Sequence, residues 1–172
     1  MIGSRKKPVP SPQDIGHFTN AAKAGDDGFG ARFLKKFGTR HIDTRNTHGD
    51  TALTLAARFN QVVVVRRLLE AGAGVDVRDG HRGTALMAAS VGGHIDVLQE
   101  LLDHGADITK KSYAHKTAHW YADVNHHSAA ATLIADTPRR HAEKADRTAQ
   151  SLTGGIEKPI VVIKPLRFAA RP

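Results

Sequence analysis

Apolar residues in the middle of the chain recur with the spacing of amphipathic helices. One stripe, three and four positions apart, predicts a helix with a single apolar face; it consists of Ile95, Leu98, Leu101 and Leu102. The stretch 84–108 divides at Gly92–Gly93, so a shorter helix is predicted in front, with Thr84 as its N-terminal cap. Gly105 suits the left-handed position that ends a helix. The stretch therefore predicts the order helix, turn, helix, turn.

The same pattern returns at an offset of 33 residues. At that offset Thr51 aligns with Thr84 and Thr117, and no gap is needed. The alignment also places Val62–Val65 on the helical positions Ile95–Leu98. Four consecutive valines favour a strand by local propensity, but the repeat predicts that they lie in a helix because tertiary context overrides that preference.

The residues that recur are the strings TALTLAA, TALMAAS, GGH, LLEAGA and LLDHGAD. Together they resemble the ankyrin repeats, whose 33-residue units have a T-P-L-H-x-A core, a following G-H and an L-L-x-x-G-A ending. Alanine replaces the consensus proline in all three clear units. The resemblance covers about residues 15–136 and implies an all-α ankyrin-repeat solenoid of about four stacked helix-turn-helix units with short hairpin loops.

The first unit is degenerate, because its string AAKAG fits the end of a first helix only if about two residues shift before Ile42. The string GDDGFG, residues 25–30, lacks the 12-residue frame of a calcium loop and is expected to be an irregular turn. We expect the following segments: flexible residues 1–14, an ankyrin domain 15–136 (repeats 15–45, 46–78, 79–111 and 112–136), a polar capping helix or linker 137–153, and an extended tail 154–172.

The resemblance also implies where a partner protein would bind. Ankyrin stacks present an extended concave surface made of hairpin tips and first helices. The implied positions lie at the loop tip, before the capping threonine and near the end of the first helix. They are Thr47, His48, Asp50, Arg58 and Phe59 in the second unit, Gly80, His81, Gly83, Val91 and Gly92 in the third, and Tyr113, Ala114, Lys116, Val124 and Asn125 in the fourth.

Cations recur near the tips of the predicted hairpins. Arg45, Arg78 and Lys111 share one repeat position, and His48 and His81 share another, which predicts a ladder suited to an acidic partner segment. The alternative is that these are solvated loop charges, which contribute little when exposed. In that interpretation they are partly balanced by Asp43, Asp50, Asp76 and Asp79.

Two aromatic residues are the better candidates for anchoring a partner. Buried aromatic side chains tend to dominate the energy of an interface, which favours Phe59 and Tyr113. Phe59 could equally pack into the turn between two helices.

Composition and charge narrow the function further. The chain has 172 residues, no cysteine and a formal net charge of +8. Residues 1–14 carry +2, residues 15–136 carry +1 and residues 137–172 carry +5, so a nucleic-acid binder would have to use the tails or local clusters of basic residues. The lack of cysteine excludes disulfides, thiolate catalysis and Cys-ligated zinc, and is compatible with the cytosol. No export signal is predicted, and no apolar run approaches the roughly 20 residues of a membrane span.

Neither a metal site nor catalysis is predicted. Four histidines of the last unit invite a metal hypothesis: His115, His119, His126 and His127. However, no carboxylate completes a ligand set, and His115 precedes the expected helix. No phosphate-binding loop, nucleophile elbow or framed carboxylate pair is present in the sequence.

We therefore expect a non-enzymatic, cytoplasmic and monomeric protein-interaction module or adaptor without a cofactor. Two alternatives remain: a nucleic-acid or anionic-surface binder acting through the basic tails, and a regulatory subunit of a separate enzyme. Measuring affinity at increasing salt concentration distinguishes the first alternative from protein binding, because affinity for phosphates falls steeply with log salt.

Overall fold

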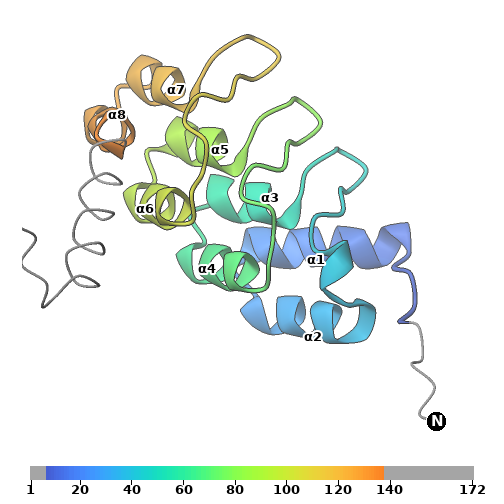
Figure 1. The fold of residues 1–172 in the computed structure, drawn as a ribbon. Coiled ribbons are helices and arrows are strands. Elements are labelled where there is room, and N and C mark those ends of the chain that lie inside the picture. Colours follow the sequence, from blue (N-terminus) through green and yellow to red (C-terminus); the bar gives the residue numbers. More distant parts are fainter. Residues whose placement is uncertain (1–6, 138–172) are drawn as a thin grey trace, which may run out of the picture. The chain divides into compact units, whose positions relative to one another are not determined.

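The computed structural model describes residues 7–137, which lie within one compact unit, Met1–Thr137. The regular elements of the described part are paired α-helices and one short 3-10 helix (Figure 1). The elements are α1 (Pro12–Ala24), α2 (Asp27–Phe37), η1 (Thr39–His41), α3 (Ala52–Arg58), α4 (Val62–Glu70), α5 (Ala85–Gly92), α6 (Ile95–Asp103), α7 (Ala118–Val124) and α8 (Ser128–Ala135). Residues 138–172, with most of the predicted capping helix 137–153 and all of the tail 154–172, lie outside the described residues.

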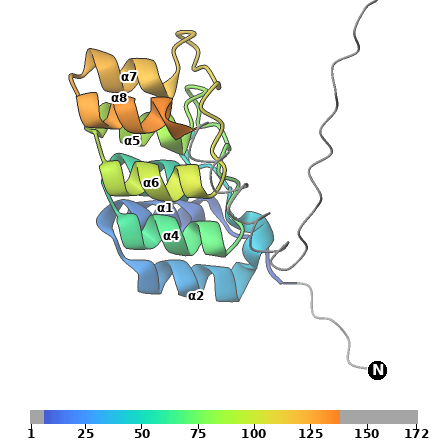
Figure 2. The same cartoon turned by 60° about the vertical axis from the view of Figure 1, so that its left-hand side comes forward.

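The helices form two layers that repeat along the stack. The first helices α1, α3, α5 and α7 pack in order, and the second helices α2, α4, α6 and α8 pack beside them (Figures 1 and 2). The hairpin loops that precede α3, α5 and α7 all project from the same side. This arrangement is the predicted all-α solenoid of four helix pairs.

Each of the three regular first helices begins at a threonine cap. The hydroxyl of Thr51 accepts the backbone N–H of Thr54 at 3.1 Å, and Thr84 does the same for Met87 at 3.4 Å. Thr117 repeats the bond with Trp120 at 3.4 Å. A threonine cap satisfies an N–H that the first turn of a helix leaves without a partner. The predicted cap at Thr84 is therefore confirmed.

The four valines lie in a helix, as the repeat predicted. They form the first turn of α4, whose inner face buries Val64 and Val65 while Val63 stays exposed. Burial against neighbouring helices thus outweighs the modest helix propensity of β-branched residues.

The core lies between the two helix layers. In the third repeat Val97, Leu98 and Leu101 have no exposed surface. The first repeat uses larger aromatic side chains at this place, with the rings of Phe18 and Phe33 stacked at 4.2 Å between centroids. Aromatic side chains therefore supply a large part of the core in the degenerate first unit.

The first helix starts earlier than we expected. Within the segment 1–14, Pro12 is already the first residue of α1, because Ser11 and Asp14 form a reciprocal capping box. The string GDDGFG also differs from the expected irregular turn. Gly25 ends α1 in the left-handed conformation at φ 82°, and Asp26 caps α2, so the last four letters belong to a helix.

Neighbouring repeats are joined by side chains that bond to the next backbone. Gln61, His94 and His127 share one repeat position, and each side chain lies 3.1 Å from a carbonyl oxygen at the end of the preceding first helix: Lys23, Arg58 and Val91. These bonds satisfy carbonyls that a helix C-terminus leaves open. The repeat position therefore has a structural role.

Candidate partner-binding surface

The hairpins and first helices enclose a hollow of about 210 Å³, here called the concave hollow. Its wall combines polar groups from the hairpins with apolar side chains from α5. It includes Arg58, His81, Met87, Val91, Ser112 and Tyr121. Three of these, Arg58, His81 and Val91, are among the residues that the sequence assigned to partner binding, so the structure brings them together.

Arg58 joins two hairpins at the edge of the concave hollow. Its Nη2 lies 3.3 Å from Asp50 Oδ1 in its own repeat and 3.6 Å from Asp79 Oδ2 in the next. Asp79 also accepts the backbone N–H of His81 at 2.8 Å and of Gly83 at 2.7 Å, which holds the hairpin closed. Two carboxylates thus offset one guanidinium, and Arg58 is a positioned side chain rather than an unpaired cation.

Large apolar side chains remain exposed around this hollow. Val91 and Val124 occupy the same repeat position in α5 and α7, and they are 47% and 49% exposed. Phe59 is 43% exposed beside the equivalent Arg58, and Tyr113 is 65% exposed at the tip of the last hairpin. Grouped apolar side chains on a protein surface mark interaction sites.

Three exposed aromatic rings in this region each have a cationic side chain stacked over them. Lys23 Nζ lies 4.7 Å from the centre of the Phe59 ring, Arg82 lies 5.5 Å from that of Tyr113, and Lys116 Nζ lies 4.6 Å from that of Trp120. Such pairs are attractive because the face of an aromatic ring is negative. Phe59 is therefore partly exposed beneath Lys23, rather than packed away in the inter-helix turn.

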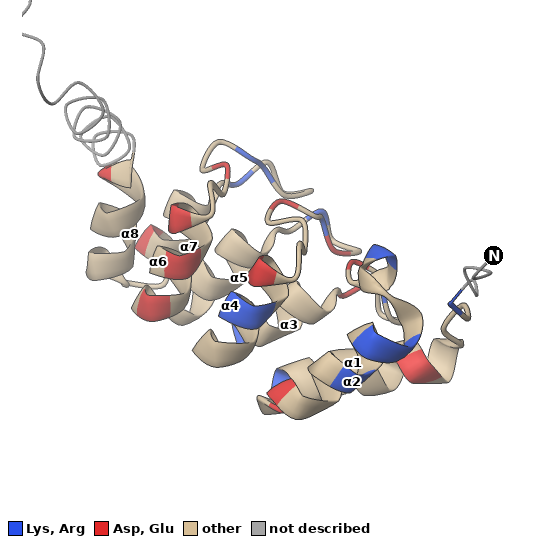
Figure 3. Ribbon diagram, turned by 60° about the horizontal axis from the view of Figure 1, so that its bottom comes forward, with Lys and Arg blue, Asp and Glu red and all other residues tan. Residues whose placement is uncertain are grey.

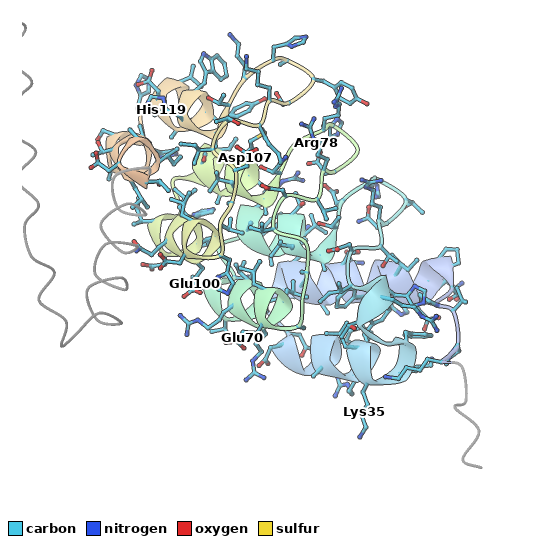
Figure 4. All side chains as sticks on the ribbon, viewed as in Figure 1. Lys35, Glu70, Arg78, Glu100, Asp107 and His119 are labelled. Carbon is cyan, nitrogen blue, oxygen red and sulfur yellow. The ribbon has the colours of Figure 1, made fainter. Side chains whose placement is uncertain are left out.

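Two cations of the predicted ladder bond to the backbone of the next hairpin. Arg45 Nε donates to the carbonyl of Arg78 at 2.9 Å, and Arg78 Nη1 donates to the carbonyl of Lys111 at 3.2 Å. Figure 3 shows these hairpins carrying both basic and acidic residues, and Figure 4 places Arg78 beside them. Arg45 and Arg78 thus connect neighbouring repeats.

Two of the aspartates that the alternative interpretation assigned to balance the ladder, Asp43 and Asp76, bond to backbone. Asp43 accepts the backbone N–H of Gly74 at 3.1 Å, and Asp76 accepts that of Asp107 at 3.1 Å. Both bonds run to the next repeat, so these carboxylates satisfy partly buried backbone groups and connect neighbouring repeats.

Gly83 also lines the concave hollow, and the remaining predicted residues lie outside it. His48 is exposed at its hairpin tip, with Nδ1 at 3.4 Å from Thr47 Oγ1, and Lys111 is exposed on the last hairpin. Asn125 donates its amide to the Tyr121 carbonyl at 2.7 Å and so closes the end of α7. That bond gives Asn125 a structural role.

Sequence reasoning missed two aromatic residues here. Tyr121 lines the concave hollow, and its hydroxyl lies 3.0 Å from Ser112 Oγ. Trp120 takes the position at which Thr54 and Met87 are buried in the preceding repeats, yet it is 38% exposed. No repeat follows it in the described part of the chain. The sequence signal that could have identified Trp120 is a tryptophan at a position where the consensus has histidine.

The described histidines do not form a metal centre. Within residues 7–137 no group of three histidine, aspartate or glutamate side chains is placed to hold a metal ion. His127 instead lies against the Val91 carbonyl. Of the helices in this range, none has the length and apolar character to cross a bilayer.

Comparison with known proteins agrees with this geometry. The family model for ankyrin repeats matches three copies over residues 18–112, more than half of the chain. No curated protein matches the sequence. The matched range contains α3 to α6 with their threonine cap and leucine pairs, and the fourth helix pair, α7 and α8, lies beyond it. The chain therefore belongs to the ankyrin-repeat family, whose repeats in general mediate protein–protein interactions.

Proposed function

We propose that this protein is a non-enzymatic interaction module, an adaptor, that binds one partner protein across its concave surface. The partner segment inserts an apolar side chain into the concave hollow and directs acidic side chains to the hairpins. Adaptor function, cytoplasmic location and the monomeric state are part of this proposal.

The observation that carries the proposal is the grouping of exposed apolar side chains around the hollow. Val91 lines it, and three aromatic rings are exposed on the hairpins and at the first helices: Phe59 in the second repeat, and Tyr113 and Trp120 in the fourth. Apolar and aromatic residues at the centre of an interface supply most of its binding energy once water is excluded. A hollow of this size accommodates a side chain of a partner.

The acidic character of the partner is supported by the charges beside these rings. Arg82 and Lys116 stand over Tyr113 and Trp120, and His81 lines the hollow. Arg58 is already offset by Asp50 and Asp79, so the free positive charge lies toward the hairpin tips. Complementary charge of this kind selects a partner and its orientation more than it adds affinity.

The test compares partner capture by two variants that bring the same charge to different faces. Val91→Glu places a carboxylate in the wall of the concave hollow, and Val63→Glu places one on the outer face of α4, where Val63 is 59% exposed. We expect Val91→Glu to lose the protein that co-purifies with the wild type, and Val63→Glu to retain it. Circular dichroism of both variants checks that the helices are intact.

Equal capture by both variants would contradict the proposal. The nucleic-acid alternative has its own signature, since affinity for phosphates falls linearly with log salt. A ligand that remains bound to Val91→Glu but is released by salt would favour the basic tails instead.

A further inference from the structure

Two exposed valines provide apolar contacts in neighbouring repeats of the concave surface. Val91 near the end of α5 lines the concave hollow and is 47% exposed. Val124 at the end of α7 holds the same repeat position and is 49% exposed. In the second repeat this position is Arg58, which is offset by Asp50 and Asp79. The apolar contacts at this repeat position are therefore two side chains, one repeat apart.

The distance between the two valines restricts the conformation of a segment that contacts both. Their helices, α5 and α7, pack directly on one another (Figure 1). The axes of packed helices lie about 8–10 Å apart, and equivalent side chains of the two helices are separated by a similar distance. A polyproline II helix has three residues per turn and rises about 3.1 Å per residue, so its side chains return to one face every 9.3 Å or so. Residues i and i+3 of such a segment therefore meet the two valines.

The other regular conformations match this spacing less well. A β-strand rises about 3.3 Å per residue and alternates its faces, so side chains on one face lie about 7 Å or about 13 Å apart. An α-helix presents side chains on one face about 5–6 Å apart and again, seven residues on, at about 10.5 Å. An α-helix is also about 10–12 Å wide, whereas the concave hollow accommodates a side chain.

The polar wall of the concave hollow also favours an extended segment. It carries the hydroxyl groups of Tyr121 and Ser112, which lie 3.0 Å apart, and the imidazole of His81. The backbone groups of a polyproline II segment make no hydrogen bonds within the segment, whereas those of an α-helix are already paired. Hydroxyl and imidazole groups both donate and accept hydrogen bonds, so they replace the water that such open backbone groups lose on binding.

Two cations stand on the hairpins beside these contacts. The Arg82 guanidinium lies 5.5 Å from the centre of the Tyr113 ring, and Lys116 Nζ lies 4.6 Å from that of Trp120. In a polyproline II segment the residues between i and i+3 point away from the valines, and one of them faces the hairpins. An acidic residue at that position complements Arg82 and Lys116.

We propose that the partner presents an extended polyproline II segment with two apolar residues three positions apart and acidic residues next to them. One apolar side chain enters the concave hollow beside Met87 and Val91, and the other covers Val124. The acidic residues face Arg82 and Lys116. The inference rests on the proposed protein-binding function and specifies the partner of the same surface. Proline-rich segments adopt this conformation before binding, so little conformational entropy is lost when they dock.

The test adds two synthetic octapeptides of equal composition to the full chain. The leucines are three positions apart in Glu-Pro-Leu-Glu-Pro-Leu-Glu-Pro and two positions apart in the isomer Glu-Pro-Leu-Glu-Leu-Pro-Glu-Pro. Trp120 is the one tryptophan of the chain and is exposed in the fourth repeat, so its fluorescence reports binding of these peptides. We expect a dissociation constant on the order of 0.1 mM for the first peptide. The isomer should bind about tenfold more weakly, because it buries one leucine instead of two.

Two further peptides test the conformation and the charge. A helical peptide of alanine, glutamate and lysine, with two leucines seven positions apart, should bind more weakly than the first octapeptide. The first octapeptide with glutamine in place of glutamate should bind about two- to fivefold more weakly, as expected for exposed charge pairs.

Two valine variants test the register on the surface. Val124→Ser should weaken the first octapeptide about tenfold and remove its advantage over the isomer, because the second leucine loses its apolar contact. Val63→Ser is the matched control, since Val63 lies on the outer face of α4 and is 59% exposed. It should bind both octapeptides like the wild type. Circular dichroism checks that both variants keep their helices.

The proposal is overturned by any of five results: no binding of the first octapeptide at millimolar concentration, equal affinity of its isomer, equal affinity of its glutamine form, tighter binding of the helical peptide, or unchanged binding by Val124→Ser. None of these results contradicts the protein-binding function, which Val91→Glu and Val63→Glu test by partner capture. Loss of capture in Val91→Glu alone, with any of the five results, would retain the concave surface and reject the extended segment.

Discussion

At the residue scale, the clearest consequence concerns the leucine pairs. Leu101 has no exposed surface, whereas Val63 on α4 is on the outside. We expect Leu101→Ala to lower the free energy of unfolding by about 2–5 kcal/mol, because it removes buried contacts and leaves a cavity. Val63→Ala should change it by less than about 0.5 kcal/mol. Denaturant titration followed by circular dichroism measures both, and an unchanged midpoint for Leu101→Ala would refute the assigned core.

A second residue-scale prediction is a dependence of stability on acid. The hydroxyl of Thr109 bonds to Asp107 at 2.6 Å, and with the Thr109 backbone N–H and Lys110 it lowers the Asp107 pKa below the ordinary 3.8. A depressed folded-state pKa stabilises the fold above the unfolded value, and this contribution is lost as pH falls through the folded value.

As pH falls below about 5, Asp107→Asn should therefore lose less stability than the wild type. Thermal midpoints measured at a series of pH values test this. Asp96→Asn, on the exposed side of α6, is the control for loss of one negative charge. Identical acid profiles for the wild type and Asp107→Asn would contradict the assignment.

At the scale of elements, the hairpins are connected by the two arginines of the ladder. Removing both side chains, in Arg45→Ser with Arg78→Ser, deletes two bonds between neighbouring repeats. We expect the free energy of unfolding to fall by about 1–2 kcal/mol. Lys111→Ser should change it little, because Lys111 contributes its backbone carbonyl, which the substitution keeps. If all three substitutions are equally neutral in thermal melts, the ladder is only solvated charge.

At the scale of the whole molecule, stability belongs to the stack of repeats. Its described helices end at Ala135, and each packs on its neighbours. Deleting residues 156–172, which lie outside the described range, should keep the helical signal and a single cooperative melting transition. It should reduce partner capture if the tail is a docking peptide. A truncated chain that fails to fold would show that the tail packs on the repeats.

The sequence by itself was sufficient for the family, the helix pairs and the caps. The reason is that a 33-residue period, a threonine before each first helix and apolar residues at helical spacing are local signals that neighbouring units repeat. The same reasoning placed Val62–Val65 in a helix. The resemblance to the family also implied that Arg58, His81 and Val91 lie on one surface.

Only the tertiary structure decided which polar side chains are available to a partner and which bond within the protein. Arg45 and Asp43 look like solvated charges in the sequence, but each reaches a backbone group of the next repeat. Trp120 is exposed although its equivalents Thr54 and Met87 are buried. These properties depend on which atom of a neighbouring repeat lies opposite a side chain. That is a distance in space, and the order of residues along the chain does not contain it.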